Sequence, residues 1–433
     1  MDKRTLETIL LEQKHELEVK ARTRRCRRME ESLVNLDSNL AQVVIGVRRS
    51  GKSTLCFNVL HQSGVRYAYV NFDDERLEGL RAADLNNVLE TLYKINGEFT
   101  HLFLDEIQNV YGWHLFVNRM LRQGMKVVVT GSNAKLLSGE LATHLTGRHN
   151  TIALYPFSFR EYCEYKGINT ELMTTKEEAF RRSAFDEYIR KGGFPELLSE
   201  GDNRQYVGAL VDDILERDIR QRYKVRYFAA FERMAHHIMN MAPVVLSPTD
   251  LTQTFGFQSS QTTKNYIKYL EQAYLLVGLN KYSTKSRQRL TEEKAYTVDV
   301  AVMDNRPDAM VGENIGWRME TIVYIELCRR SRTEGTDIYY YKKHSRAKEV
   351  DFVVCRGNKI LRMYQVAYSL TNDKTRLREI DSLVQASNDT KCRELYLITD
   401  FERETVEKDG CRIEIIPAYE WLLSYSADST KMP

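Results

Sequence analysis

The chain has 433 residues, of which 42% are hydrophobic and 28% are charged. This composition is typical of a globular protein and excludes an intrinsically disordered chain, and the length leaves room for roughly two to four domains. Sixty-three basic residues against 60 acidic residues give a formal net charge of only +3, which excludes a strongly basic protein that attracts nucleic acid through its overall charge.

The seven cysteines are scattered along the chain and show neither a metal-ligand spacing nor a disulfide framework, which indicates a reducing compartment. The first thirty residues are charged throughout and therefore differ from a signal peptide. No apolar run approaches the roughly 18–20 residues that a membrane span requires. We expect a soluble, cytoplasmic protein with no membrane partner.

Residues 1–35 are expected to form an N-terminal helical segment, and its basic stretch, residues 22–28, is interpreted as a solvated face. From Ala41 onward, short β-branched or apolar runs alternate with longer amphipathic stretches; the runs are QVVIGV, YAYVNF, HLFLDE, KVVVTG and TIALYP. This alternation predicts an α/β fold with a parallel sheet over residues 36–165.

Residues 46–53 match the phosphate-loop pattern G-x-x-x-x-G-K-[ST] directly after the apolar run QVVI. In such a loop the glycines let backbone N–H groups turn toward phosphate oxygens, Lys52 supplies a positive charge, and the Ser53 hydroxyl can ligate Mg²⁺. The sequence therefore predicts an ATP site. Its expected members are Gly46, Val47, Arg48, Arg49, Ser50, Gly51, Lys52, Ser53 and Thr54.

The run HLFLDE supplies the two acids that hydrolysis of ATP would need. Asp105 ends an apolar strand, where its carboxylate can hold Mg²⁺ together with Ser53. Glu106 follows directly and can polarise the attacking water. A small-molecule kinase has no need of such a water-activating acid, so the pair favours an ATPase over a phosphotransferase.

Two further groups could act near the γ-phosphate. After the strand at 126–129, either Ser132 or Asn133 could sense the γ-phosphate or the attacking water, or could instead cap the following helix. Arg148 precedes the run TIALYP and could neutralise transition-state charge, in its own chain or in a neighbouring copy of a homo-oligomer. The competing interpretation of Arg148 is a plain surface arginine.

Residues 166–225 lose the strand pattern and predict a helical lid. In residues 226–305, two capped amphipathic stretches predict a winged helix-turn-helix that contacts DNA phosphates or, alternatively, a protein partner. The polar and basic groups available for such contacts are Gln261, Thr262, Lys264 and Lys268, followed by Lys281, Lys285, Arg287 and Arg289 on the wing. His236 and His237 have no second ligand pair near them in the sequence, which argues against a metal site.

Several segments together carry a resemblance to a known family: GVRRSGKST, HLFLDEIQNV, VVVTGSNAKLLSGE, LTGR, LYPFSFREY and GGFPELL. From about residue 36 onward the chain resembles archaeal- and bacterial-type AAA-superfamily ATPases that join an ATPase core to a C-terminal domain resembling restriction endonucleases. The resemblance implies an AAA-type core, with Walker roles for Lys52, Ser53, Asp105 and Glu106, a first sensor at Asn133 or Ser132, and an arginine contact from Arg148.

For residues 306–433 the resemblance implies a PD-(D/E)xK nuclease-like α/β domain, in which acids from a helix and two strands collect magnesium beside a lysine. The helix offers Glu320 or Glu326, and the strand EVDFVV offers Asp351. Gln365 stands where the next acid is expected. Three of these residues, Glu320, Asp351 and Gln365, therefore form a degenerate site.

Ala367 occupies the position expected for the lysine of that site, and alanine cannot replace a cation. We therefore expect no DNA cleavage, unless Lys348 or Lys359 takes the role of the missing lysine. The whole sequence predicts a Mg²⁺-dependent ATPase that couples its ATP state to contacts with DNA or a protein. The alternatives are a slow nucleotide-dependent switch and a metal-dependent nuclease licensed by ATP.

Overall fold

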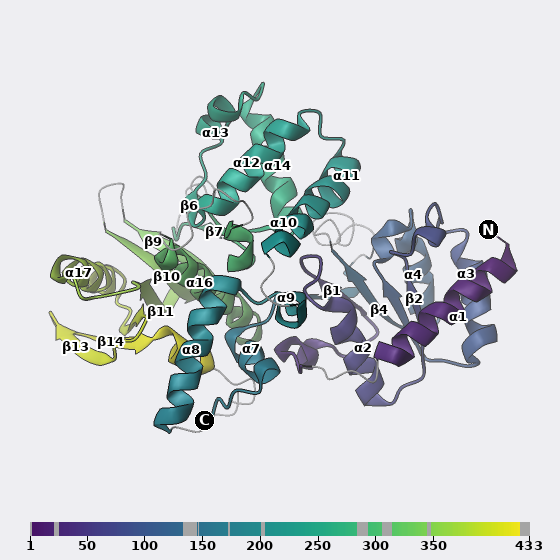
Figure 1. The fold of residues 1–433 in the computed structure, drawn as a ribbon, viewed down its shortest axis with the longest axis horizontal. Coiled ribbons are helices and arrows are strands. Elements are labelled where there is room, and N and C mark those ends of the chain that lie inside the picture. The colour runs from purple at the N-terminus through teal and green to yellow at the C-terminus, as the bar shows by residue number, and fades with distance from the viewer. Residues whose placement is uncertain are drawn as a thin grey trace. The chain divides into compact units, whose positions relative to one another are not determined.

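The computed structural model describes residues 2–20, 26–132, 145, 147–171, 174–200, 204–283, 293–304, 314–343 and 348–424. The chain divides into two compact units (Figure 1). Unit 1 comprises the chain up to Tyr155 together with Gln272–Tyr274, and unit 2 comprises the remainder. No helix of the described residues combines the length and the apolar character needed to cross a lipid bilayer.

Unit 1 is built on a five-stranded sheet in which every pair of neighbouring strands runs parallel, in the order β2-β3-β4-β1-β5. The strands are β1 (Ala41–Ile45), β2 (Tyr67–Asn71), β3 (His101–Asp105), β4 (Lys126–Gly131) and β5 (His149–Ala153). They overlap the five apolar runs of the sequence, because helices cover both faces of the sheet and side chains on both faces are therefore mostly apolar. The predicted parallel α/β core is confirmed.

Helices lie on both faces of this sheet. They are α1 (Lys3–Lys20), α2 (Lys52–Ser63), α3 (Leu85–Asn96) and α4 (Trp113–Arg122), with the 3₁₀ turns η1 (Met29–Leu33), η2 (Glu75–Leu77) and η3 (Ile107–Asn109). On one face, Leu55 and Leu60 of α2 share a buried cluster with Val44 of β1. On the other, Val43 shares a cluster with α1, α3 and α4, since successive strand residues point to opposite faces.

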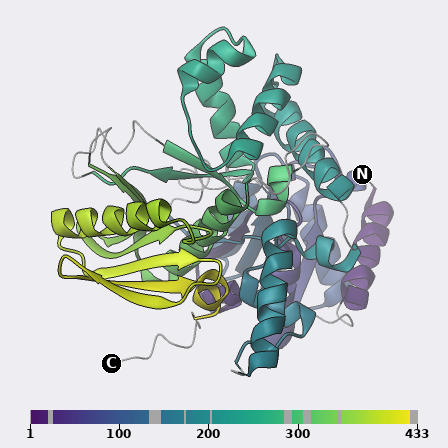
Figure 2. The same ribbon diagram turned by 60° about the vertical axis from the view of Figure 1, so that its left-hand side comes forward.

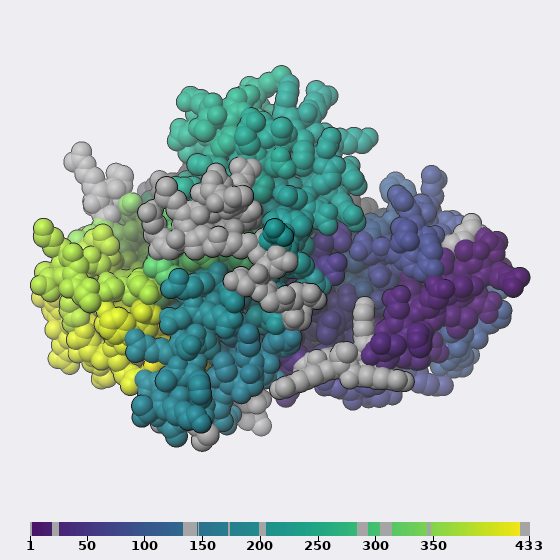
Figure 3. Space-filling model, viewed as in Figure 1, coloured from purple at the N-terminus to yellow at the C-terminus, as the bar shows by residue number. Residues whose placement is uncertain are grey.

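The N-terminal segment differs from the sequence-based expectation. Helix α1 spans Lys3–Lys20, residues 26–28 are not helical, and Leu6, Ile9 and Leu10 are buried in the core of unit 1. In the space-filling view α1, in purple, lies along the surface of unit 1 (Figure 3). Arg28, predicted to be solvated, is only 4% exposed.

The first part of unit 2 is helical, as the loss of strand pattern predicts. Its elements are α7 (Phe159–Lys166), α8 (Thr175–Lys191), α9 (Pro195–Glu200), α10 (Arg204–Asp213), the π-helix η4 (Ile214–Arg220), α11 (Gln221–Tyr223) and α12 (Phe228–Met241). A capping box explains the start of α7. The Ser158 hydroxyl accepts a hydrogen bond from the Glu161 backbone N–H, and the Glu161 carboxylate accepts one from the Ser158 backbone N–H.

The two capped helices predicted next are α13 (Pro248–Phe255) and α14 (Ser260–Gln272). The Ser247 hydroxyl caps α13, and Gly256 ends it in the left-handed conformation. A small antiparallel sheet with the order β6-β8-β7 accompanies them. Its strands are β6 (Val244–Val245), β7 (Leu276–Asn280) and β8 (Glu293–Thr297), and the turn η5 (Val300–Asp304) follows.

The last part of unit 2 contains a mixed six-stranded sheet in the order β13-β14-β12-β11-β10-β9 (Figure 2). The strands are β9 (Asp337–Lys342), β10 (Glu349–Arg356), β11 (Lys359–Val366), β12 (Glu394–Thr399), β13 (Glu404–Lys408) and β14 (Cys411–Pro417), and the helices are α16 (Ile315–Glu334), α17 (Asp373–Thr390) and α18 (Ala418–Leu423). Leu383 of α17 is buried with Val353 on one face. Tyr324 of α16 stacks on Phe352 on the other face.

Candidate nucleotide-binding site

The loop between β1 and α2 has a backbone that only glycine allows at its start. Gly46 has φ +155°, and a Cβ atom there would collide with the carbonyl oxygen of Leu154. Gly51, at φ +93°, directly precedes Lys52, the first residue of α2. The first turn of a helix leaves its N–H groups without intrahelical acceptors, so α2 directs positive partial charge into this loop.

The loop is supported from beneath by a residue that sequence reasoning missed. Arg28 donates to the backbone oxygen of Ser50 at 3.0 Å and to that of Tyr155 at 2.7 Å. The Ser50 hydroxyl is buried and has no hydrogen-bond partner among the described residues. The buried Ser50 hydroxyl, which lacks a partner among the described residues, and the space at Gly46, which a Cβ atom would fill, both fit a bound phosphate group. Nothing in the basic run RTRRCRR distinguishes Arg28 from its neighbours.

Lys52 lies in the middle of the site and is 4% exposed. Its Nζ donates to the backbone oxygens of Gly46 at 3.2 Å and Val47 at 3.1 Å, and lies 3.6 Å from Glu106 Oε1. The ammonium group is therefore held at the mouth of the loop, where a phosphate oxygen could replace these acceptors.

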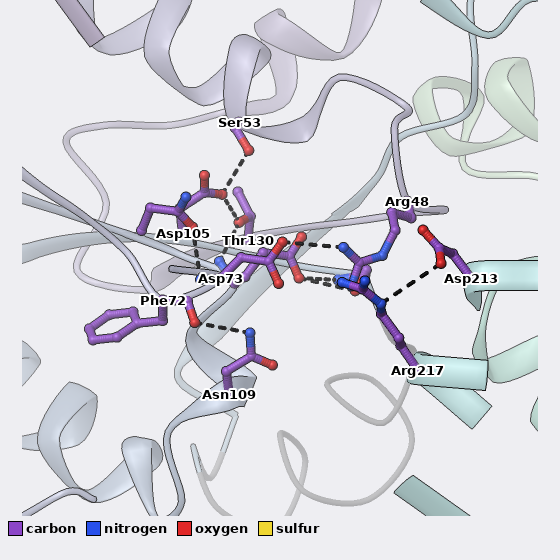
Figure 4. A network of polar contacts seen from close by, with 12 residues as sticks. Arg48, Ser53, Phe72, Asp73, Asp105, Asn109, Thr130, Asp213 and Arg217 are labelled. Carbon is purple, nitrogen blue, oxygen red and sulfur yellow. Dashed lines mark hydrogen bonds and ion pairs between the residues drawn. The ribbon is translucent and has the colours of Figure 1, made fainter. Parts of the chain in front are cut away.

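Asp105 ends β3 and accepts hydrogen bonds from three hydroxyl groups, of which those of Ser53 and Thr130 are labelled in Figure 4. Ser53 Oγ donates to its Oδ1 at 2.8 Å, Thr130 Oγ1 donates to the same oxygen, and the Tyr69 hydroxyl donates to Oδ2 at 3.3 Å. Burial, followed by the neighbouring charge of Glu106, raises the pKa of Asp105 to about 6, although the Thr130 and Ser53 bonds oppose the rise. Ser53 and Asp105 are thus adjacent, as a shared Mg²⁺ ligand set would require.

Glu106 adopts the left-handed conformation, with φ +51°, which is uncommon for a residue with a side chain. Its backbone N–H donates to Thr130 Oγ1 at 2.9 Å, and its Oε2 accepts from Ser132 N at 3.1 Å and Ser132 Oγ at 3.0 Å. Burial alone would raise the pKa of Glu106. The charge of Lys52 and the bonds from Gln108 and Ser132 outweigh burial and lower it.

The strand order explains why Thr130 and Ser132 reach both acids. Strand β4 lies between β1 and β3, so its carboxyl end is inserted between the phosphate loop and Asp105. Ser132, one of the two predicted sensors, contacts Glu106, while Asn133 lies outside the described residues. The sequence shows hydroxyl residues, Thr130 and Ser132, at the end of this strand, but it does not reveal which acid each of them contacts.

The remaining loop residues take different positions. Val47 is buried, whereas Arg49 and Thr54 are exposed. Arg48 extends toward Asp73, and their side chains meet at 3.2 Å (Figure 4). In the same view Asn109 donates to the backbone oxygen of Phe72, which ties the segments after β2 and β3 together.

Arg148 lies far from the phosphate loop of its own chain. It is exposed and directly precedes β5, whose first residue, His149, pairs with Ala41 at the beginning of β1. The loop follows the opposite end of β1, which five residues at about 3.3 Å each place roughly 16 Å away. The structure therefore excludes an arginine contact within one chain and leaves a contact to a neighbouring copy as a prediction.

A second polar site lies in the last part of unit 2. A cavity of about 310 Å³ brings together Glu320, Asp351 and Gln365, as the sequence predicts. The alternative helix acid, Glu326, is instead paired with Arg330 at 2.9 Å and does not line the cavity. Ala367 is packed in the hydrophobic core.

Sequence reasoning missed an acid that lines this cavity and a cation that pairs with two of its lining acids. Glu379 of α17 lines it and accepts from Gln365 Nε2 at 2.8 Å. Lys294 of β8 lies 3.6 Å from Glu320 Oε1 and 2.5 Å from Glu349 Oε1. Burial and the charge of Glu320 raise the pKa of Asp351 well above its usual value.

The two lysines predicted as substitutes for the missing cation take different positions. Lys348 lines the cavity, and its Nζ donates to Asp381 at 2.9 Å. Lys359 is exposed at the start of β11 and does not line the cavity.

The lysines of α14 predicted to contact DNA lie on its solvent-exposed side. Lys264 and Lys268 are exposed and one turn apart, while Tyr266, Ile267 and Leu270 are buried. Of the predicted wing residues, Lys281 is described; Lys285, Arg287 and Arg289 lie outside the described residues.

Comparison with known proteins covers most of the chain. Residues 38–163 match the family described as "AAA domain", and residues 182–306 and 316–421 match two families, each described as a domain of unknown function, DUF8612 and DUF4143. An uncharacterized protein of Methanocaldococcus jannaschii is 32% identical over 407 residues, 90% of each chain. An uncharacterized protein of Haemophilus influenzae is 29% identical over 401 residues, 89% of this chain and 95% of its own.

Among solved structures, a Walker-type ATPase of Pyrococcus abyssi is similar over 64% of this chain and 93% of its own, with 15% identity and a TM-score of 0.40. Similarity at this level is too low to assign a function.

Proposed function

Because the chain belongs to the AAA-superfamily proteins in which a P-loop ATPase domain precedes C-terminal domains of unknown function, we propose that it is a Mg²⁺-dependent ATPase whose nucleotide state controls contacts with DNA or a protein partner. In this proposal residues 36–165 form the ATPase core, residues 166–225 its lid, residues 226–305 a winged helix, and residues 306–433 a nuclease-like domain.

One observation carries the ATPase proposal: Lys52, Ser53, Asp105 and Glu106 converge at the carboxyl edge of the sheet, beside a loop that fits phosphate. Lys52 would exchange its loop carbonyl acceptors for oxygens of the β- and γ-phosphates. Ser53 and Asp105 would hold Mg²⁺, which supplies charge that offsets the phosphate oxygens. Glu106, whose pKa is lowered, would stay ionised at neutral pH and orient the attacking water.

The hydroxyl groups of β4 would position the two acids. Thr130 joins Asp105 to the backbone of Glu106, and Ser132 fixes the Glu106 carboxylate. Either Ser132 or Asn133 would act as the sensor of the γ-phosphate. Arg148 would act only on ATP bound by a second copy, which makes a homo-oligomer part of the proposal.

The test is ATP binding and turnover measured with three variants. Lys52→Ala should lose tight ATP binding, because it removes the positive charge that would offset the negative charge of the phosphates. Glu106→Gln should keep binding and lower turnover by about 100-fold or more, because only the water-orienting group changes. Glu90→Gln, which alters an exposed acid of α3 paired with Lys3, is the control and should match the wild type. Wild-type turnover in Glu106→Gln would refute the assigned role.

Repeating the turnover assay with a panel of single-stranded, duplex and branched DNA tests the coupling. We expect DNA to change turnover in the wild type. If no DNA changes the turnover, coupling to DNA is refuted and coupling to a protein partner remains as the proposal.

For the C-terminal domain we propose a nuclease-like fold without cleavage activity. Gln365 contributes no charge, and Lys294 is already neutralised by Glu349 and Glu320. A second candidate function, an ATP-licensed nuclease, is favoured by one observation: Glu379 lines the cavity and Lys294 pairs with Glu320 and Glu349, so they could replace the missing acid and lysine.

Incubation with supercoiled plasmid, Mg²⁺ or Mn²⁺, and ATP separates these two candidates. We expect no nicking above background. Nicking that disappears in Asp351→Ala would establish the nuclease, and its dependence on Lys52 would show whether ATP licenses it.

A further inference from the structure

Three side chains of the kinds that ligate metals meet in unit 2, and none of them belongs to the two sites described above. They are Asp212 of α10 and Glu232 and His236 of α12, and one ligand atom from each lies within 4.8 Å of the other two. The sequence argued against a metal here because His236 and His237 lack a second ligand pair nearby. The third ligand comes instead from a helix about twenty residues earlier, which only the packing of the helices reveals.

The geometry of α12 explains how two of the ligands come together. Glu232 and His236 are four residues apart, so they lie on the same face of the helix. His236 is 5% exposed, and its Nε2 lies 3.6 Å from Asp212 Oδ1. The neighbouring His237 is exposed and points away from the core. The imidazole is thus held in place by the protein interior and faces a carboxylate on another helix.

The accessibility of the three groups suits an ion that enters from solvent. The Asp212 side chain is 62% exposed, and Glu232 is partly exposed. Zinc bonds of about 2.0–2.2 Å place tetrahedral ligands about 3.4 Å apart. The two carboxylates therefore need to move by about 1 Å, which rotation of solvent-exposed side chains can provide, while the buried imidazole stays fixed.

We propose that Asp212, Glu232 and His236 form a binding site for a divalent transition metal of the zinc class, with water in the remaining position. An imidazole ligand selects zinc and its neighbours over magnesium and calcium, which prefer oxygen ligands alone. Its three ligands are different residues from those that would hold ATP and Mg²⁺ in the proposed ATPase.

The position of the site indicates a structural consequence. Helix α10 ends at Asp213 and continues directly into the π-helix η4, a hydrogen-bonding pattern that is rare in proteins. A metal bound through Asp212 would tie the end of α10 to α12 just before this change. Zinc should therefore stabilise this helical region against thermal unfolding.

The experiment titrates the metal-stripped full-length chain with Zn²⁺ in competition with a chromophoric chelator. The wild type should bind one tight Zn²⁺ that Asp212→Asn and Glu232→Gln each weaken by roughly 100-fold, since even changes to groups behind a ligand commonly cost 10- to 100-fold. Two controls lie beside the ligands: His237→Gln and Asp213→Asn should bind Zn²⁺ as tightly as the wild type.

Co²⁺ provides the second readout. A site made of one imidazole and two carboxylates gives the visible absorption of a low-coordinate Co²⁺ without a thiolate charge-transfer band, which distinguishes it from a site at any of the seven free cysteines. Thermal melting with and without Zn²⁺ should show a rise in the wild type and in both controls, and none in the two carboxylate variants.

Either of two results would overturn the proposal. One is the absence of tight Zn²⁺ binding in the wild type, in which case the two acids are only neighbours of His236. The other is equal affinity in the wild type and both carboxylate variants. Because these variants change one exposed and one partly exposed carboxylate to isosteric amides, the test requires no substitution of the buried His236.

Discussion

Thr130→Val tests whether the hydroxyl at the tip of β4 controls the charge of the proposed magnesium ligand. Valine has nearly the shape of threonine but removes the hydroxyl that donates to Asp105 and accepts from the Glu106 backbone. A hydrogen bond to a charged group contributes about 1.5–3 kcal/mol, and each pKa unit corresponds to about 1.36 kcal/mol. Loss of the bond should therefore raise the pKa of Asp105, already about 6, by about one to two units.

The assay is the pH dependence of kcat/KM for ATP hydrolysis, which reports groups of the free enzyme. Asp105 must be ionised to hold Mg²⁺, so activity falls as the pH drops through its pKa, and a higher pKa moves this acidic limb to higher pH. Glu106, whose pKa is lowered, titrates below this range. The limb should move up by about one to two units in Thr130→Val.

Thr130→Ser is the matched control, because it keeps the hydroxyl and removes only a methyl group. It should retain the wild-type limb. Coincident profiles for the Val variant, the Ser variant and the wild type would refute the idea that Thr130 sets the charge of Asp105.

Three further predictions follow from single features of the structure. Arg28→Met should lower the free energy of unfolding by about 3 kcal/mol, because charged bonds to two buried carbonyls are lost, and should also weaken ATP binding. Arg27→Met, which changes an exposed neighbour, should do neither. Denaturant titration measures the free energy of unfolding, and an ATP titration measures the affinity. Charge reversal at Lys264 and Lys268 should weaken binding to any duplex and reduce the slope of log affinity against log salt by nearly one unit per lost phosphate contact; an unchanged slope contradicts the DNA role. Arg148→Ala should lower specific activity only under conditions where the chain self-associates, so an equal loss in dilute monomer would contradict a contact between copies.

The sequence by itself determined the elements whose information is local. The glycines, lysine and serine of residues 46–53 specify a phosphate loop because backbone conformation and helix start are encoded within eight residues. The five apolar runs specify buried parallel strands because both faces of that sheet are covered. Asp105 and Glu106 could be placed at a strand end because they directly follow one of these apolar runs.

The tertiary structure decided how those elements combine. The order β2-β3-β4-β1-β5 inserts β4 between the loop and β3, which gives Thr130 and Ser132 their partners, and it places Arg148 at the far end of the sheet. No local sequence pattern encodes strand order, because strand order depends on packing between elements that are distant in the chain.

The same reason applies to the contacts that no motif announced. Arg28 reaches Ser50 and Tyr155 across 22 and 127 positions of the chain, and Glu379 meets Gln365 across 14. Asp212 meets His236 only because α10 ends beside α12. A charged side chain reads alike in sequence whether it is solvated or buried, and only the packing around it decides which partner satisfies its charge.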